Sequence, residues 1–174
     1  MPCHSVVLRF SLLAYQSHCL KAYSPRFSFC SISNDDMATV RIITAMTIDG
    51  FLPKADSPLM QWLKTDGKGF PYWHEHSTYP VHSDYPALDL VCDKNSTDKS
   101  CIYNVEISDP ESIGFLSRLS HFNIIDQLII HILPEIAGSG NYLFSDCVPT
   151  GLILRKSVRL KNGICRNIYC RDVQ

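Results

Sequence analysis

Three residues that could do chemistry, Thr47, Asp49 and Gly50, follow directly after a run of apolar residues at 40–46. Such a continuous run is typical of a strand that is buried on both faces, and in an open α/β sheet ligands bind beyond the carboxyl ends of the strands. At that place a glycine permits a turn and a close approach of a ligand, and Asp49 could orient a substrate or assist its protonation. The same residues also fit an ordinary Asp-Gly turn that ends a strand, and the sequence leaves both interpretations open.

Histidines and aromatic residues supply the other candidates. His131 stands among isoleucines within a predicted strand, where it is either a core residue or a contact to a substrate ring. The His-Glu-His motif at 74–76 lacks a third ligand at a spacing typical of metal sites, so no metal is expected. Aromatic residues between 70 and 79 either cover the sheet or wall a pocket. The segment 64–69 is interpreted as a solvated turn, and no G-x-S-x-G motif supports acyl transfer.

The pattern of apolar residues and breakers predicts the elements that would position these side chains. Strands are predicted at 40–46, 87–92, 101–107 and 126–138, helices at 58–64 and from Ser108 to about His121, a turn at 93–99 and an irregular segment at 68–86. The second helix begins with a capping residue, a proline and an acid. Lys161-Asn162-Gly163 is expected to join two alternating strands as a hairpin. Strands that alternate with helices before a terminal hairpin indicate an α/β sheet.

Composition excludes several classes of protein. The chain has 174 residues, of which 45% are apolar and 19% charged, and its net charge of −1 suits one globular domain with a core. The balanced charge predicts neither a nucleic-acid nor a membrane partner, and no apolar run reaches the roughly 18 residues that span a bilayer. The eight cysteines form no CxxC pair, so we interpret them as reduced thiols of a cytoplasmic protein.

Residues 1–36 differ from the rest of the chain. They are rich in serine, hold no acid before Asp35 and show neither a helical nor a strand period. A transit peptide, a secretory signal and translation that begins at Met37 all remain open. In each case we exclude this N-terminal extension from fold reasoning, and the domain is predicted to span 37–174.

Two segments carry a resemblance to a known family. The segment 45–53, A-M-T-I-D-G-F-L-P, matches a first strand that ends in A-M-S-L-D-G-x-I-A, and Trp62 follows at the family's usual distance. Residues 125–144 match a late strand of the form V-D-E-L, followed by a proline, G-x-G and L-F. These segments resemble the dihydrofolate-reductase-like fold, and more closely the reductase domain of bacterial riboflavin biosynthesis and its small stand-alone relatives. The resemblance covers about residues 37–172 and implies an α/β fold with a mixed, mostly parallel sheet, helices on both faces and a C-terminal antiparallel hairpin.

The resemblance implies an NADPH-dependent reductase and assigns its site. Asp49 would be catalytic, while Thr47, Trp62 and His131 would bind a small-molecule substrate, a flat heterocycle or a ribosylamino-pyrimidine. The residues implied for NADPH are Ala45, Met46, Gly50, Gly138 and Gly140. Two features depart from the family. The Gly-Gly pair that opens a helix and holds the cofactor pyrophosphate is missing, and one helix–strand step is predicted before Asp126 where the family has two.

These departures leave a second class of function open, a degenerate reductase-fold module that binds a ligand or dimerises without a cofactor. A homodimer is expected, because a lost helix–strand step uncovers apolar strands that need cover on both faces. The hairpin is expected to offer one apolar face to the second copy. The residues of that face are Leu152, Leu154, Val158 and Leu160.

Overall fold

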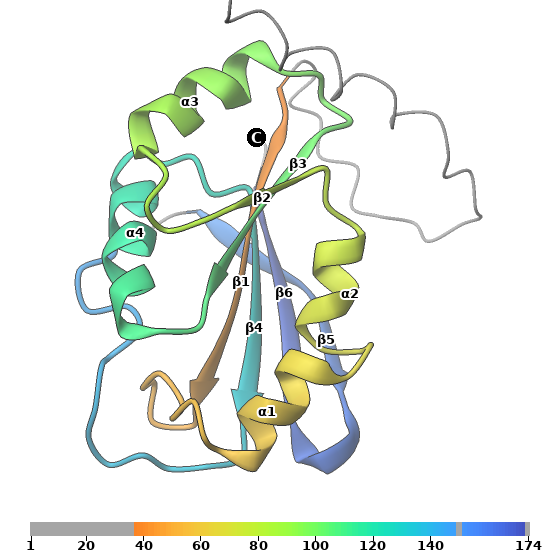
Figure 1. The fold of residues 1–174 in the computed structure, drawn as a ribbon, viewed down its shortest axis with the longest axis vertical. Helices are drawn as coiled ribbons and strands as arrows, with labels where there is room; N and C mark the ends of the chain where they lie inside the picture. Colours follow the sequence, from red (N-terminus) through yellow and green to blue (C-terminus); the bar gives the residue numbers. More distant parts are fainter. Residues whose placement is uncertain (1–36, 149–150, 173–174) are drawn as a thin grey trace, which may run out of the picture.

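The computed structural model describes residues 37–148 and 151–172, and its strands form a six-stranded sheet in the order β2-β3-β1-β4-β6-β5 (Figure 1). The strands are β1 (Thr39–Thr47), β2 (Tyr79–Val81), β3 (Ile102–Ile107), β4 (Gln127–Leu133), β5 (Leu152–Arg159) and β6 (Cys165–Arg171). The first four strands are parallel, β6 is antiparallel to β4, and β5 is antiparallel to β6. The mixed, mostly parallel sheet with a terminal hairpin is therefore confirmed. The predictions for residues 1–36 lie outside the described residues.

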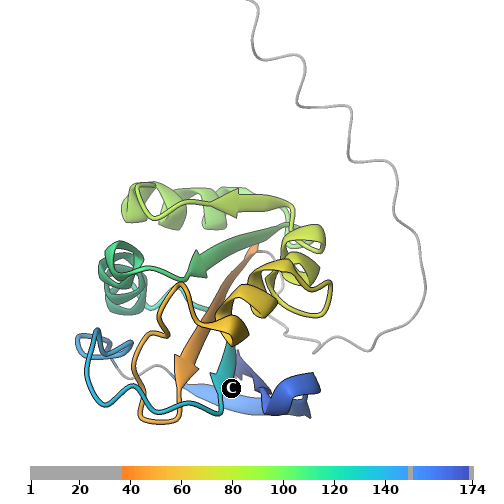
Figure 2. The same ribbon diagram turned by 60° about the horizontal axis from the view of Figure 1, so that its bottom comes forward.

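Helices cover both faces of the sheet, as Figures 1 and 2 show. On one face lie α1 (Pro58–Thr65) and α2 (Phe70–Glu75), whose Met60, Leu63 and Phe70 pack with Ile43 of β1. On the other face lie α3 (Ala87–Ser96) and α4 (Pro110–His121), which pack against the opposite side chains of the same strands. β1 is almost wholly buried because both layers enclose it. Within residues 37–148 and 151–172, none of the helices is long and apolar enough to cross a membrane.

Several elements form where the sequence predicts them, and their ends have local causes. Helix α4 begins at a capping box, in which the Asp109 carboxylate accepts from the Ser112 backbone N–H at 2.9 Å and the Asp109 backbone N–H donates to the Ser112 hydroxyl. β4 ends at Leu133, before Pro134, and so is shorter than the predicted 126–138. The hairpin turns at 161–163, where Asn162 and Gly163 both have positive φ.

The predicted strand at 87–92 is wrong, because this segment is the first part of α3. A short apolar run does not distinguish a buried strand from one face of a helix. Here Ala87, Leu90 and Lys94 lie on the buried face, while Leu88 is exposed. The helix continues to Ser96, so it also includes part of the segment predicted as a turn at 93–99.

The segment 68–86, predicted to be irregular, contains both α2 and the short strand β2. Phe70 and Trp73 are buried against the sheet, and this packing stabilises a helix whose intrinsic propensity is poor. With β2 and α3 assigned, one helix–strand step, α3–β3, lies between the second strand and α4, which leads to Asp126. The predicted single step is therefore present, although its helix lies in a segment that was predicted to be a strand.

A β-bulge at Arg155 divides strand β5. Before it Leu154 pairs with Tyr169, and after it Lys156 pairs with Ile168. The extra residue reverses the side to which the alternating side chains point. Leu152 accordingly packs with the α3–α4 layer, whereas Leu160 packs with the α1–α2 layer. The single apolar hairpin face predicted from the sequence does not form.

Candidate functional site

The carboxyl end of β1 is a tight turn closed by its own polar groups. Thr47 is 2% exposed, and its hydroxyl donates to Asp49 Oδ1 at 2.6 Å. The same hydroxyl accepts from the Phe51 backbone N–H at 3.1 Å. Gly50 has a φ of 87°, a conformation that favours glycine. The predicted turn is present, and its hydroxyl and carboxylate bind each other and the backbone.

The Asp49 carboxylate joins this turn to the segment that follows β4. Oδ1 accepts from the Ala137 N–H at 3.1 Å, and Oδ2 accepts from the Gly138 N–H at 2.7 Å. The hydrogen bond from the Thr47 hydroxyl, followed by those from the two backbone groups, lowers the pKa of Asp49 from 3.8 to about 2. The carboxylate is thus ionised at neutral pH, and these contacts suit it to holding two loops together rather than to donating a proton.

The two segments joined by Asp49 continue along each other as far as residue 143. The backbone N–H of Ile48 donates to Glu135 O, and that of Leu143 donates to Gly50 O. The Tyr142 ring lies so close to Gly50 that a β-carbon there would sit 2.8 Å from it. Gly138 and Gly140, the predicted cofactor contacts, both have positive φ within this loop. The structure therefore brings Thr47, Asp49, Gly50, Gly138 and Gly140 together, and it packs them against one another.

The residues at this edge of the sheet do not fit a dinucleotide pyrophosphate. The family holds that group at a helix N-terminus reached through a Gly-Gly pair, and the helix in the corresponding position is α4, which follows β3. Its first turn is occupied by the Asp109 carboxylate, which is itself an anion. The Gly138 N–H donates to the Asp49 carboxylate. Two donor positions at this edge thus already bind carboxylates of the chain, and a further phosphate would meet like charge.

The other predicted site residues lie away from this turn, mostly in the core beneath α1 and α2. Ala45 and Trp62 pack in that core, and Met46 packs on the opposite face of the sheet. His131 is fully buried, and its Nδ1 donates to Thr44 O at 3.2 Å. Desolvation lowers the pKa of His131 from 6.5 to about 4, so the ring is neutral. The structure does not bring these residues together with Asp49.

The histidines at 74 and 76 have protein partners. His74 Nε2 lies 2.7 Å from Glu106 Oε2, and His76 Nδ1 donates to Tyr72 O at 2.7 Å. Among the described residues, no three histidine, cysteine, aspartate or glutamate side chains are placed to hold a metal ion.

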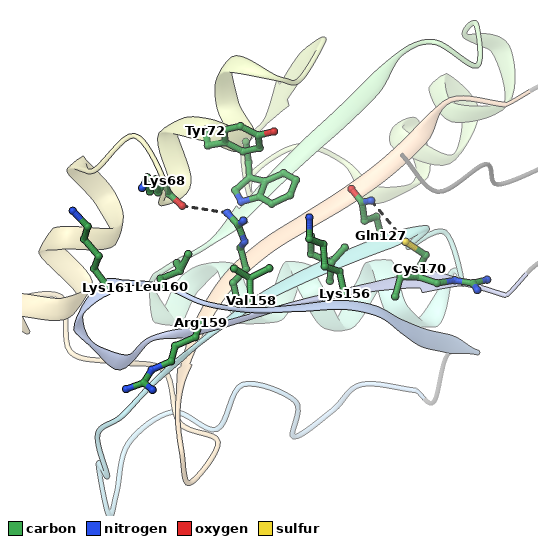
Figure 3. A pocket seen from close by; sticks show the side chains of 13 residues that line it. Lys68, Tyr72, Gln127, Lys156, Val158, Arg159, Leu160, Lys161 and Cys170 are labelled. Carbon is green, nitrogen blue, oxygen red and sulfur yellow. Dashed lines mark hydrogen bonds between the residues drawn. The ribbon is translucent and has the colours of Figure 1, made fainter. Parts of the chain in front are cut away.

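A cavity of about 770 Å³ lies between α2 and the β5–β6 hairpin, with β4 contributing one wall residue (Figure 3). We call it the basic groove. Six of the chain's 16 lysines and arginines line it, and none of the described residues in its lining is acidic. The six are Lys68, Arg155, Lys156, Arg159, Lys161 and Arg166. The remaining lining is mainly aromatic and aliphatic, with Gln127 as the amide.

The six cations do not all point in the same direction. Figure 3 shows Lys156 extending from β5 toward Tyr72 of α2, whereas Arg159 points to the opposite side of the hairpin. This difference follows from the register, in which Lys156 faces the same way as Ile168 and Arg159 the same way as Cys165. Burial lowers the pKa of Arg166, yet a guanidinium remains charged at neutral pH. The groove is therefore a concentration of positive charge in a chain with a net charge of −1.

Sequence reasoning missed the basic groove because three distant segments build it, namely α2, the start of β4 and the hairpin. Without α2, which was predicted to be irregular, the groove has no second wall. The basic residues between 155 and 161 were a signal for this groove in the sequence. The predicted alternation, however, placed them on the side of the hairpin that is opposite its apolar face.

Comparison of the sequence with models of known protein families finds no match, and comparison with curated proteins finds none either. Solved structures do match. A deaminase/5-amino-6-(5-phosphoribosylamino)uracil reductase from Thermotoga maritima gives a TM-score of 0.52 at 13% identity, over 78% of this chain and 57% of that one. RibD of Acinetobacter baumannii gives 0.54 at 11% identity, over 78% of this chain and 58% of that one. The riboflavin-biosynthesis reductase Rib7 of Saccharomyces cerevisiae gives 0.44 at 12% identity, over 81% and 92%.

The two higher TM-scores show that this chain has the dihydrofolate-reductase-like fold of riboflavin-biosynthesis reductases, as the resemblance implied. The chain spans less than two thirds of the length of those two proteins. At identities of 11% and 13%, the likeness establishes the fold alone.

Proposed function

We propose that this protein is a ligand-binding domain on the reductase fold, and that it holds an anionic small molecule in the basic groove. The observation that carries the proposal is the segregation of charge, with basic side chains gathered around one cavity whose described lining residues include no acid. Clefts that are lined by one sign of charge attract ligands of the opposite sign. The volume of about 770 Å³ lies within the usual range of small-molecule sites, roughly 300–1,000 Å³.

The proposed activity corresponds to the second class of function left open by the sequence. It places the ligand beside the hairpin instead of at the carboxyl ends of the strands, where Asp49 and Asp109 bind the local donors. An oxyanion in the groove would meet lysine ammonium groups and the Arg166 guanidinium within a partly desolvated site. There charge-assisted hydrogen bonds are stronger than they are on an open surface.

Binding of inorganic pyrophosphate, followed by melting temperature and calorimetry, tests the proposal. Wild-type protein should gain stability with increasing pyrophosphate, since a ligand at 100 times its Kd adds about 2.7 kcal/mol. Lys156→Glu reverses one charge of the groove and should remove most of the gain. The matched control is Lys54→Glu, because Lys54 is exposed and lies outside the groove lining. Equal losses in both variants would mean that pyrophosphate responds to net charge and not to the groove, and no gain in the wild type would reject the proposal.

NADPH-dependent hydride transfer to a heterocyclic substrate is the second candidate. It is supported by the fold shared with two reductases, one of which acts on a phosphoribosylamino-uracil. NADPH is itself an anion, so its binding alone does not separate the candidates. If the strand ends hold it, Gly50→Val should abolish the NADPH shift in melting temperature and Lys156→Glu should not. The reverse pattern supports the groove, and substrate-dependent NADPH oxidation by the wild type would establish the reductase.

The expected homodimer stays a proposal, but it now rests on the exposed edge strand and not on uncovered central strands. Helices pack on both faces of the central strands, so the argument from uncovered strands is lost. What remains is β5 at the edge of the sheet, where Ile153 and Leu154 are 41% and 49% exposed. An edge strand with exposed apolar side chains can pair with a second copy. Light scattering of the full chain at micromolar concentration should give the mass of a dimer, and a monomer mass would reject the proposal.

A further inference from the structure

Lys156 and Arg166 are diagonal neighbours on the groove side of the hairpin. Lys156 pairs with Ile168, and Arg166, two residues before Ile168 on the adjacent strand, pairs with Val158. Diagonal neighbours of this kind lie about 7–8 Å apart, within reach of one shared ligand. Two cations at this spacing repel each other unless an anion lies between them, and the lining residues that the structure describes supply no carboxylate.

Arg166 is held in place by two contacts that leave part of its guanidinium unused. Its Nη1 donates to Lys68 O at 3.3 Å, and its Cζ lies 5.4 Å from the centroid of the Trp73 ring. Arg166 Nε and Trp73 Nε1 are both buried, and neither has an acceptor among the described residues. A buried donor without a partner destabilises the ligand-free protein. Both donors belong to residues that line the groove, and the described part of the chain provides no oxygen for them.

The acceptors near these donors are already in use. Gln127 Oε1 accepts from Arg41 Nε, and the Gln127 NH₂ group donates to Cys170 Sγ at 3.8 Å, so this amide has only a donor hydrogen left to present. Lys68 O accepts from Arg166, and Tyr72 O accepts from His76. Lysine and arginine side chains can only donate. A ligand that fits this groove consequently brings several acceptors and little need for donors, which describes a phosphate group better than an amide or a sugar.

We infer that Arg166, Lys156 and the Trp73 N–H form a seat for the phosphate of a phosphomonoester, whose organic body covers the apolar floor made by Val158 and Ile168. The inference rests on the proposed function and narrows it from any anion to one chemical class. The guanidinium edge matches two phosphate oxygens at once, as a lysine ammonium cannot. The apolar floor gives the organic body surface to bury.

Calorimetry on the full chain tests the seat, with phenyl phosphate as the phosphomonoester and inorganic phosphate as the bare anion. Phenyl phosphate should bind at least about tenfold more tightly than phosphate, because the ring buries apolar surface. Arg166→Lys keeps the charge and loses the forked donor, so it should weaken phenyl phosphate binding about tenfold or more. Trp73→Phe keeps an aromatic ring and loses the N–H, so it should weaken binding severalfold. Arg118→Lys, on α4 and outside the groove lining, is the matched control and should bind like the wild type.

The outcomes distinguish specific binding of a phosphate by Arg166 and Trp73 from a general attraction of anions by the basic groove. If Lys156→Glu abolishes binding while Arg166→Lys and Trp73→Phe bind like the wild type, the groove attracts anions by charge alone and the seat is rejected. Equal affinities for phenyl phosphate and phosphate would reject the covered floor. If neither compound binds the wild type, both the seat and the proposed function fail. Circular dichroism of Trp73→Phe shows whether that variant folds, and Arg166→Lys decides the question if it does not.

Discussion

The surroundings of Asp126 and the basic groove are both rich in charge, and they use it in opposite ways. Asp126 is buried and accepts from Lys94 Nζ at 2.5 Å and from the Val40 backbone N–H at 2.8 Å. Arg171 Nε lies 3.6 Å from the same carboxylate. This cluster ties α3, β1 and β6 to the start of β4. In the basic groove, cations from β5, β6, the turn between them and the loop before α2 gather without one carboxylate among the described lining residues.

The difference shows which charges hold the fold and which are available to a ligand. A buried ion such as Lys94 needs its partner, because the desolvation of an unpaired charge is costly. Lys156 and Lys161 stay solvated and cost little when they have no partner, so they can serve a ligand instead. If this distinction is right, substitutions in the two regions should affect stability and binding in opposite senses.

The largest effect is expected at the Asp126 cluster. Asp126→Asn keeps the shape of the side chain but leaves Lys94, 7% exposed, as a buried cation without its carboxylate. We expect the free energy of unfolding in urea to fall by about 3–5 kcal/mol. Adding Lys94→Met should restore part of the loss, because the double variant buries no unpaired charge. A fall below 1 kcal/mol in the single variant would show that this cluster is as dispensable as a surface ion pair.

The pH dependence of the unfolding free energy tests whether His131, on the groove side of the sheet, is buried and neutral. Its pKa is about 4 in the folded state and about 6.5 when exposed, so the unfolded chain binds the proton more readily. The stability that the neutral ring permits is fully present above pH 6.5 and is lost as the pH falls toward 4. The loss is on the order of 3 kcal/mol. His131→Leu should flatten the curve of unfolding free energy against pH in this window. Parallel curves for variant and wild type would contradict a buried, neutral His131.

Asp49 should affect the local order of one loop more than global stability. Asp49→Asn weakens the bonds to the N–H groups of Ala137 and Gly138, which join the turn to the segment after β4. Limited proteolysis should cut the variant faster within residues 135–143 than the wild type. Asp56→Asn, on the same connection, serves as the control. Equal cutting rates for all three proteins would mean that other contacts hold the loop.

The smallest effect is expected in the groove itself. Lys156→Met removes one of two repelling cations and should leave the unfolding free energy of the ligand-free protein unchanged or raise it by a few tenths of a kcal/mol. The same variant should lose affinity for pyrophosphate. A gain in stability that accompanies a loss of binding is the expected sign of residues kept for a ligand. A clear loss of stability would place Lys156 among the residues that hold the fold.

Strong local signals made much of the fold predictable. The continuous apolar run of β1, the Asp-Pro start of α4 and the Asn-Gly turn each depend on residues that are close in sequence, and each element forms where it was expected. The segment at 87–92 was not predictable in this way. Its six residues are apolar enough for a strand, and it becomes a helix because Ala87 and Leu90 can pack with α4 on one face.

The sites were harder to predict than the elements. The sequence placed Asp49 at a strand end, where it lies, but could not show that both carboxylate oxygens meet backbone donors from residues 137 and 138, almost 90 positions away. The basic groove depends in turn on a bulge and on a six-residue helix held by packing. Neither has a pattern that a reader of the sequence alone can distinguish from an ordinary alternating strand and a loop.

The extra residue in β5 also shifts the alternation of its side chains by one position. Upstream of Arg155, even-numbered side chains point to the α3–α4 layer, and downstream they point to the α1–α2 layer. One strand can therefore place an apolar residue against the α3–α4 layer and a cation beside the α1–α2 layer. If Arg155 instead paired with Ile168, so that the strand continued without a bulge, Ser157 and Arg159 would face the cavity and Lys156 would turn away from it. The cations that a ligand can reach thus depend on the position of the bulge as well as on the residue types.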